Sequence, residues 1–302
     1  MKRFISSISH MSDWIDLARN YLRRSKPPLK SFPPAEADVA YGPKRLQKLD
    51  FWHPTETVYE KSPVLIFFHG GGFVRGKKHH GRLLREAQAL GVAAVSANYR
   101  LTRLPGTTVE DSMNDAVSVL EKVLEKAEDW NLDTSRIALA GNSAGGCMAL
   151  WIAFTENPCA VKCVTTYNSL TSLDPDDLVG KIGGPRISHY RPLWTLLFDA
   201  KGKDGLKDKR VRDIIERHSP NNFFHDGVPP VFLEFSEDPP PDSEDYPKGT
   251  SPLKLLHSPR YGYLLQELYQ KLAQECVVSH PAKPAEETSL DFLKKHLLEL
   301  TN

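Results

Sequence analysis

The sequence predicts an α/β fold, in which a mostly parallel sheet is covered by helices on both faces. Two observations predict it: short apolar runs such as Val64–Phe68 alternate along the chain with longer amphipathic segments such as Val109–Glu128, and the runs lack the polar alternation of half-exposed strands. Both patterns are typical of strands buried on both faces of a parallel sheet.

The first 36 residues are expected to form a separate N-terminal segment. Apolar side chains recur from Phe4 to Leu22 in steps of three and four, which places them on one face of a helix. The prolines at 27, 28, 33 and 34 then predict a linker. The helix either packs on the protein body or covers an active site as a lid.

The main domain is expected over residues 37–302, and it opens with a β-hairpin. Two strand-like stretches, Val39–Tyr41 and Arg45–Phe51, flank the turn residues Gly42 and Pro43. With the later strands, this hairpin gives a sheet of about eight strands. The later strands are expected at Val64–Phe68, Ala93–Asn98, Arg136–Ala140, Val161–Tyr167, Val231–Phe235 and Cys276–Ser279. The helices are expected at His80–Leu90, Val109–Glu128, Gly145–Glu156, Tyr261–Gln274 and Ser289–Leu300.

A long irregular segment near residues 173–226 interrupts this alternation. It is charged in places, is broken by Gly and Pro, and lies between two expected strands, so we expect a cap at the C-terminal edge of the sheet. Its aromatic and apolar side chains either line an apolar binding site or form the packed face of a cap helix. These residues are Tyr190, Leu193, Trp194, Leu196, Leu197 and Phe198.

The composition of the chain argues against a nucleic-acid-binding protein and against a membrane-spanning protein. Lys and Arg number 39 against 38 Asp and Glu, so no basic footprint indicates a nucleic-acid partner. No apolar run approaches the roughly 20 residues of a membrane span, and no hydrophobic signal segment follows Met1. We therefore expect a cytoplasmic protein with a small-molecule substrate. Free thiols are expected, with no metal site and no cofactor, at Cys147, Cys159, Cys163 and Cys276.

A strand, a sharp turn and a helix are expected to meet at Gly141-Asn142-Ser143-Ala144-Gly145. The apolar run Arg136–Ala140 leads into the turn and an apolar helix leads out of it. A serine in such a strained turn presents its hydroxyl as a nucleophile, and the turn needs small neighbours. The helix N-terminus also favours developing negative charge. Ser143 is therefore the candidate nucleophile.

Three consecutive glycines follow the strand Val64–Phe68, in the sequence His69-Gly70-Gly71-Gly72-Phe73. Glycines let the backbone approach a substrate closely and aim N–H groups at an oxyanion. Together with the serine turn, this loop resembles the hormone-sensitive-lipase-like and feruloyl/acetyl-esterase-like branches of the α/β-hydrolases. The resemblance extends from about residue 37 to 300 and includes Tyr99-Arg100-Leu101, Asp133–Ile137, Ser219-Pro220 and Pro229-Pro230-Val231.

The resemblance implies the α/β-hydrolase fold and assigns roles around the serine. The N–H groups of Gly71, Gly72 and Ala144 would form the oxyanion hole, and His69 would brace the loop. A serine nucleophile of this kind works with an acid and a base in the chain order Ser, Asp or Glu, His. After the strand Val231–Phe235, Asp238 fits the acidic turn of the family best. Glu237 is the second choice, and Asp242 and Asp245 are weaker candidates.

His280 follows the last expected strand and is the candidate base. The sequence departs from the family here, because Pro281-Ala282 stand where a glycine or an aromatic is usual, and because Pro239–Pro259 lengthens the chain between acid and base. His257 and His296 are expected to be surface histidines, and His257 is the first alternative base if His280 does not serve. His79 and His80 are expected to be solvated or to line the entrance to the site.

These features predict a serine hydrolase that cleaves a carboxylic ester of a small apolar or aromatic substrate through an acyl-enzyme. An aryl formamidase or amidase would use the same residues. A water-excluding cap would instead permit non-hydrolytic acyl transfer or cyclisation of a specialised metabolite. The departures around His280 also leave open a non-catalytic ligand-binding α/β-hydrolase. The sequence does not indicate an oligomeric state.

Overall fold

The computed structural model describes residues 32–155, 161–183, 191–202, 204–240, 245–247 and 249–299. The expected N-terminal helix over residues 4–22, Cys159, Tyr190 and Asp242 lie outside these residues. None of the helices in the described ranges combines the length and the apolar character needed to cross a membrane.

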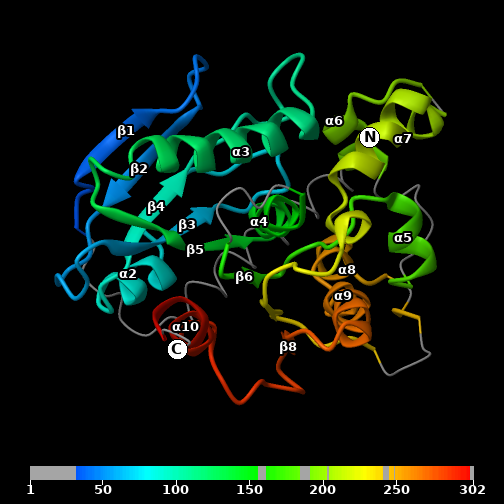
Figure 1. Ribbon diagram of the computed structural model, residues 1–302. Coiled ribbons are helices and arrows are strands. Elements are labelled where there is room, and N and C mark those ends of the chain that lie inside the picture. Colours follow the sequence, from blue (N-terminus) through cyan, green and yellow to red (C-terminus); the bar gives the residue numbers. More distant parts are fainter. Residues whose placement is uncertain are drawn as a thin grey trace.

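An eight-stranded sheet forms the centre of the described chain (Figure 1). The strand order is β1-β2-β4-β3-β5-β6-β7-β8. Strand β2 runs antiparallel to β1 and β4, and the other neighbouring pairs are parallel. The predicted fold class is thereby confirmed. The strands are β1 (Glu36–Ala40), β2 (Lys48–Trp52), β3 (Ser62–Phe68), β4 (Ala93–Ala97), β5 (Leu132–Asn142), β6 (Cys163–Tyr167), β7 (Val231–Glu234) and β8 (Cys276–Ser279).

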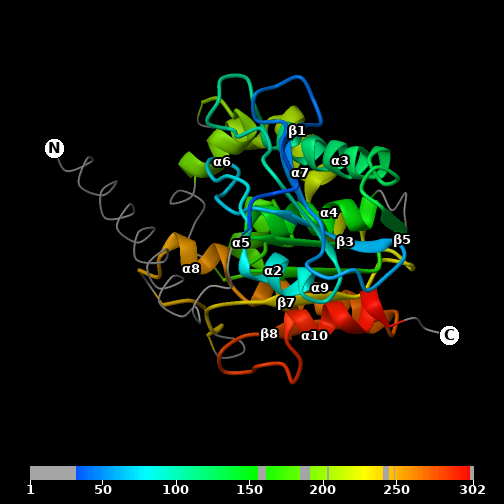
Figure 2. The ribbon, with the colours of Figure 1, turned by 90° about the vertical axis from the view of Figure 1, so that its left-hand side faces the viewer.

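The side chains of the central strands alternate between two apolar cores. In β3, Val64, Ile66 and Phe68 join the larger core, whereas Leu65 and Phe67 join the smaller one. Helices α3 (Val109–Glu125), α4 (Ala144–Thr155) and α9 (Arg260–Lys271) cover the larger core. Helices α2 (Arg82–Gln88) and α10 (Ser289–Leu293) cover the smaller one. Figure 2 shows α3 and α10 on opposite sides of the strands. Burial on both faces explains why these strands are continuously apolar.

Among the boundaries that differ from the predicted ones, two have local reasons. Strand β2 begins at Lys48 rather than Arg45, because Gln47 donates its N–H back to Lys44 O (2.9 Å) in a tight turn. Helix α2 begins at Arg82 rather than His80, because the N–H of His79 is bound by Ser96 Oγ (3.0 Å) in the preceding loop. The last helix continues from α10 as a π-helical turn over Lys294–Leu298.

Between β6 and β7 lies the segment that was expected to form a cap. It contains α5 (Pro175–Gly180), α6 (Arg191–Phe198) and α7 (Lys209–His218), with short 3-10 turns at Gly205–Lys207 and Pro220–Phe223. Trp194, Leu197 and Phe198 of α6 are buried in the larger core, whereas Leu196 is 38% exposed. Most of the apolar residues of α6 therefore form a packed helix face. Helix α8 (Pro252–Leu256) follows β7 and precedes α9.

Candidate active site

Ser143 lies at the end of β5, where the chain turns sharply into α4. Its φ of 49° is in the left-handed region, which is rare for a residue with a side chain. Its N–H donates to Tyr167 O at the end of β6 (2.8 Å), and its carbonyl accepts the N–H of Cys147 (3.0 Å). These backbone bonds hold the strained turn and do not involve the side-chain hydroxyl.

The glycines on either side of Ser143 are required by close packing. A Cβ on Gly141 would lie 2.3 Å from the carbonyl of Gly145, and a Cβ on Gly145 would lie 2.1 Å from Phe68 O. Both distances are far below any van der Waals contact, so larger residues would push β3 and α4 apart. The spacing of the Gly-x-Ser-x-Gly motif is thus explained by the backbone geometry of this turn.

The hydroxyl of Ser143 is hydrogen-bonded to a histidine. Its Oγ lies 3.0 Å from Nε2 of His257, which follows α8 directly. The expectation that His257 is a surface residue is wrong, because its side chain is only 5% exposed. Its N–H donates to Leu253 O (3.0 Å), which fixes the residue at the end of the helix.

Burial lowers the pKa of His257 to about 4. The imidazole is therefore neutral at neutral pH, since the charged form is penalised away from water. In the tautomer that carries its proton on Nδ1, Nε2 accepts the Ser143 hydroxyl. This is the geometry that a general base needs to take a proton from a serine nucleophile.

Asp238 and His280 form the pair that the sequence predicted, but the pair contacts another residue. Nδ1 of His280 lies 2.7 Å from Asp238 Oδ1, and its Nε2 lies 2.7 Å from the hydroxyl of Tyr263. The N–H of Ala282 and the bond to His280 lower the pKa of Asp238. Both ring nitrogens of His280 are therefore engaged away from Ser143, for which the sequence predicted His280 as the base.

Glu237, the second choice for the acid, does not contact His280 or His257. Glu237 forms an ion pair with Lys254 (3.3 Å) on a solvent-exposed part of α8. Desolvation is the cause of the lowered pKa of His257, and no carboxylate contributes to it within the described residues. In the described structure, Asp238 is thus hydrogen-bonded to His280, whereas Ser143 is hydrogen-bonded to His257.

The glycine loop lies beside the serine turn. A Cβ on Gly70 would be 2.9 Å from Asn142 O, the residue before Ser143. Gly71 and Gly72 adopt φ values of 125° and 61°, and the carbonyl of Gly71 accepts the N–H groups of Val74 and Arg75. A Cβ on Gly71 would lie 2.0 Å from Arg75 O, whereas a Cβ on Gly72 would meet nothing within 4 Å. The loop therefore turns tightly at Gly71 and is open at Gly72.

His69 is packed inside the protein behind this loop. Its Nδ1 lies 2.8 Å from Gly70 O, and its ring stacks on Tyr99 with centroids 4.2 Å apart. The Tyr99 hydroxyl donates to His69 O (2.8 Å). Burial lowers the pKa of His69 to about 4, so it is a neutral packing residue. Near the loop, His80 stacks on Trp52 (4.6 Å).

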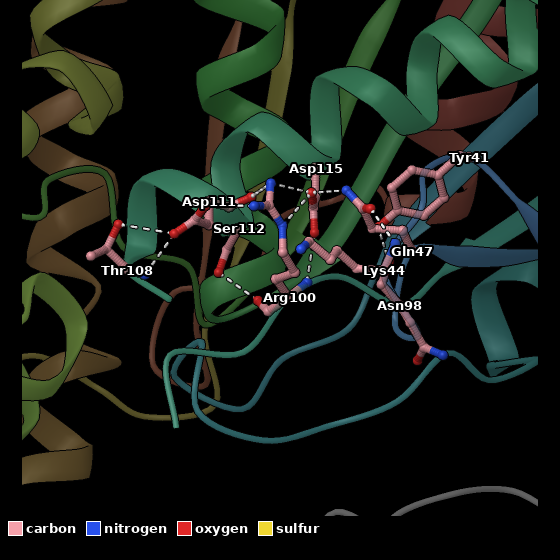
Figure 3. Close-up of polar contacts among 9 residues, drawn as sticks. All are labelled: Tyr41, Lys44, Gln47, Asn98, Arg100, Thr108, Asp111, Ser112 and Asp115. Carbon is pink, nitrogen blue, oxygen red and sulfur yellow. Dashed lines mark hydrogen bonds and ion pairs between the residues drawn. The ribbon is translucent and has the colours of Figure 1, made fainter. Parts of the chain in front are cut away.

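A polar network secures the chain that follows Tyr99 (Figure 3). Asp115 of α3 is fully buried and accepts hydrogen bonds from the guanidinium and the backbone N–H of Arg100, at 2.7–2.9 Å, and from Gln47 Nε2 (2.7 Å). Beyond Arg100, the N–H of Thr102 donates to Phe73 O (2.9 Å). The network therefore connects α3 to the glycine loop through two hydrogen-bonded segments.

Tyr263 was not assigned to the site from the sequence, and His257 was named there only as an alternative base. His257 follows Leu253, Leu255 and Leu256 closely, and three leucines in five residues are a signal of burial that the histidine shares. The signal for Tyr263 is weaker, because one tyrosine on an amphipathic helix does not reveal its hydroxyl partner. In the described part of the chain, no three His, Cys, Asp or Glu side chains are grouped so that they could hold a metal ion.

Known proteins resemble parts of this chain. Residues 65–173 match a family described by the α/β-hydrolase fold. Esterase LipI of Mycobacterium tuberculosis is 37% identical over 105 residues, covering 34% of this chain and 32% of the relative. Carboxylesterase NlhH of the same organism is 34% identical over 141 residues (45% and 43%), and tuliposide A-converting enzyme 2 of Tulipa gesneriana is 30% identical over 168 residues (51% and 43%). The chain thus spans less than half the length of these relatives.

Solved structures match a larger share of the chain. A truncated carbohydrate esterase from gut microbiota has a TM-score of 0.64 at 14% identity, over 91% of this chain and all of the other. Esterase B of Lactobacillus rhamnosis has a TM-score of 0.61 at 16% identity, over 90% and 84%. These likenesses support the fold. The sequence relatives show in addition that part of the chain is similar to esterases of the α/β-hydrolase fold.

Proposed function

We propose that the protein is a serine esterase that cleaves a carboxylic ester of a small apolar or aromatic substrate through an acyl-enzyme at Ser143. The observation that carries the proposal is the 3.0 Å contact between Ser143 Oγ and His257 Nε2 in the strained turn after β5. A serine hydroxyl bound to a neutral, buried imidazole is an activated nucleophile. The names of the relatives, which include esterases and a carboxylesterase, support an ester as the substrate.

The reaction follows from this geometry in two halves. Ser143 Oγ attacks the ester carbonyl while His257 takes its proton, and the resulting oxyanion is bound by the N–H groups of Gly71, Gly72 and Ala144. His257 then gives the proton to the departing alcohol oxygen, which leaves an acyl group on Ser143. In the second half, water attacks this acyl group with His257 again as base, and the acid leaves.

The contact between Ser143 and His257 favours catalysis over ligand binding alone. Amide cleavage, acyl transfer and cyclisation use the same first half, but no observation favours them over ester hydrolysis. These reactions differ in the group that leaves the substrate and in the group that accepts the acyl chain. Kinetic assays with different substrates and acceptors can tell them apart.

The test is a series of p-nitrophenyl esters from acetyl to octanoyl, assayed with the purified chain and with Ser143→Ala. We expect hydrolysis by the wild type, with a maximum at one acyl length. Ser143→Ala should lose on the order of a million-fold in kcat, with an unchanged circular dichroism spectrum and melting temperature. A variant that keeps most of the activity would show that Ser143 is not the nucleophile. A wild type that binds these esters without turnover would indicate a binding protein.

A further inference from the structure

The three side chains of Asp238, His280 and Tyr263 form one hydrogen-bonded chain. Asp238 Oδ1 lies 2.7 Å from Nδ1 of His280, and Nε2 of His280 lies 2.7 Å from the Tyr263 hydroxyl. The carboxylate can only accept, so His280 donates from Nδ1. With neutral His280, Nε2 then accepts the Tyr263 proton. His280, which is 6% exposed, is the buried middle of this chain, whereas the side chain of Asp238 at one end is 46% exposed.

Tyr263 belongs to α9, and its bond is one of several that fix this helix on the sheet. Gln266 Nε2 donates to Cys276 O in β8 (2.8 Å). Gly262 permits the close approach, because a Cβ there would lie 2.8 Å from the ring of Phe235 and 3.1 Å from Val278. The first turns of α9 are thus held to the sheet by Tyr263, Gly262 and Gln266.

The start of α9 is connected directly to His257. Ser258, the next residue, is fully buried; its Oγ accepts the N–H of Arg260 (3.1 Å) and is bound by the Tyr246 hydroxyl (2.7 Å). The carbonyl of Ser258 accepts the N–H of Tyr261 (3.1 Å). His257 therefore lies on a short, hydrogen-bonded connection between α8 and α9, and a shift of α9 moves its imidazole.

We propose that Asp238, His280 and Tyr263 are positioning residues, which hold α9 so that His257 stays in register with Ser143. This inference rests on the proposed function, because it assigns to His257 the role of base. The acid and histidine that the family pattern supplies would then act through a tyrosine and a helix. They would contribute to the rate by geometry, since small displacements of a base reduce proton transfer strongly.

The experiment compares two tyrosine variants of the same helix. Tyr263→Phe removes the hydroxyl that binds His280. Tyr269→Phe is the matched control, because its hydroxyl is also on α9 and donates to Pro229 O (2.6 Å) rather than to His280. We expect Tyr263→Phe to lower kcat about tenfold, with KM and the pH midpoint of kcat/KM unchanged. Tyr269→Phe should leave kcat within about twofold, even where it lowers the melting temperature.

Two results would overturn the proposal: an unchanged or raised kcat in Tyr263→Phe, or an equal loss of kcat in both variants. His280→Ala provides a second test. The Asp238 side chain is 46% exposed, so water can solvate its carboxylate in this variant. We expect it to lose about ten- to a hundredfold in kcat and to keep the wild-type pH midpoint. A loss as large as that of His257→Ala, with a changed pH profile, would make His280 the base. Failure of the proposed function itself would appear separately, as full activity in Ser143→Ala.

Discussion

Ser143 Oγ and His257 Nε2 lie 3.0 Å apart, although the two residues are separated by 114 positions in the chain. The histidine comes from the segment before the last strand, not from the loop after it. His280, in that loop, binds Asp238 and Tyr263 instead. The structure thus has the predicted pair of Asp238 and His280, but a different histidine contacts Ser143.

The pH dependence of kcat/KM should reflect a base with a depressed pKa. Burial lowers the pKa of His257 to about 4, and a general base acts only when it is unprotonated. Activity should therefore rise between about pH 3.5 and 5 and stay flat through neutral pH. The measurement is kcat/KM for an aryl ester from about pH 3 to 9, with recovery at pH 7 after each acid exposure as the control. A rise centred at or above ~6.5, the value of an unperturbed imidazole, would contradict His257 as base.

The two glycines that we propose for the oxyanion hole should respond differently to substitution by alanine. At Gly71 an added Cβ would collide with Arg75 O, whereas at Gly72 it would meet nothing, so only the positive φ resists the change there. Gly72→Ala should lower the free energy of unfolding by about 1 to 2 kcal/mol, and Gly71→Ala by more. Urea unfolding of both variants measures this. Equal losses would show that the Gly71 turn is not tight.

Acid should destabilise the fold through the two buried histidines. Burial lowers the pKa of both His69 and His257 to about 4, below the unfolded value near 6.5. Between these values the unfolded chain binds more protons, so stability is present above about pH 6.5 and is lost as pH falls toward 4. Each group contributes a slope of up to about 1.4 kcal/mol per pH unit.

The measurement is the free energy of unfolding in urea at pH 7, 6 and 5. His257→Gln keeps a polar group at this position but cannot titrate, so its curve should be flatter than that of the wild type. Superimposable curves would show that His257 is not protonated on unfolding in this range.

Asp115 should be the most important residue of the network in Figure 3. It is fully buried and accepts from both Arg100 and Gln47, so Asp115→Asn leaves the guanidinium with less compensation. We expect a loss of about 2 to 3 kcal/mol in the free energy of unfolding. Asp111→Asn, at a more exposed contact of the same Arg100, is the control and should cost less. The reverse order would contradict this ranking.

The sheet and the serine turn could be predicted because their causes are local. Strands such as β3 are buried on both faces, so each is a continuous apolar run. Gly141 and Gly145 contact each other and β3 through the backbone, so only small residues fit at that spacing. The sharp turn at Ser143 could therefore be predicted from five residues and the segments on either side of them.

The partner of Ser143 could not be predicted in this way. It depends on where His257, in the long connection between β7 and α9, is placed in the fold, and no periodicity of the sequence encodes that placement. The pairing of Asp238 with His280 was predicted from chain order, and the structure has it. Chain order does not predict the contact of the Tyr263 hydroxyl. This hydroxyl is hydrogen-bonded to Nε2 of His280, the nitrogen that was expected to contact Ser143.

The most direct test of the central claim measures the reactivity of Ser143 without a known substrate. A fluorophosphonate labels an activated serine, and peptide mass spectrometry gives the labelling rate at Ser143 in the wild type, His257→Ala and His280→Ala. We predict rapid labelling of the wild type, a loss of at least about a thousandfold in His257→Ala, and a smaller loss of about ten- to a hundredfold in His280→Ala. Wild-type labelling in His257→Ala together with its loss in His280→Ala would contradict the account.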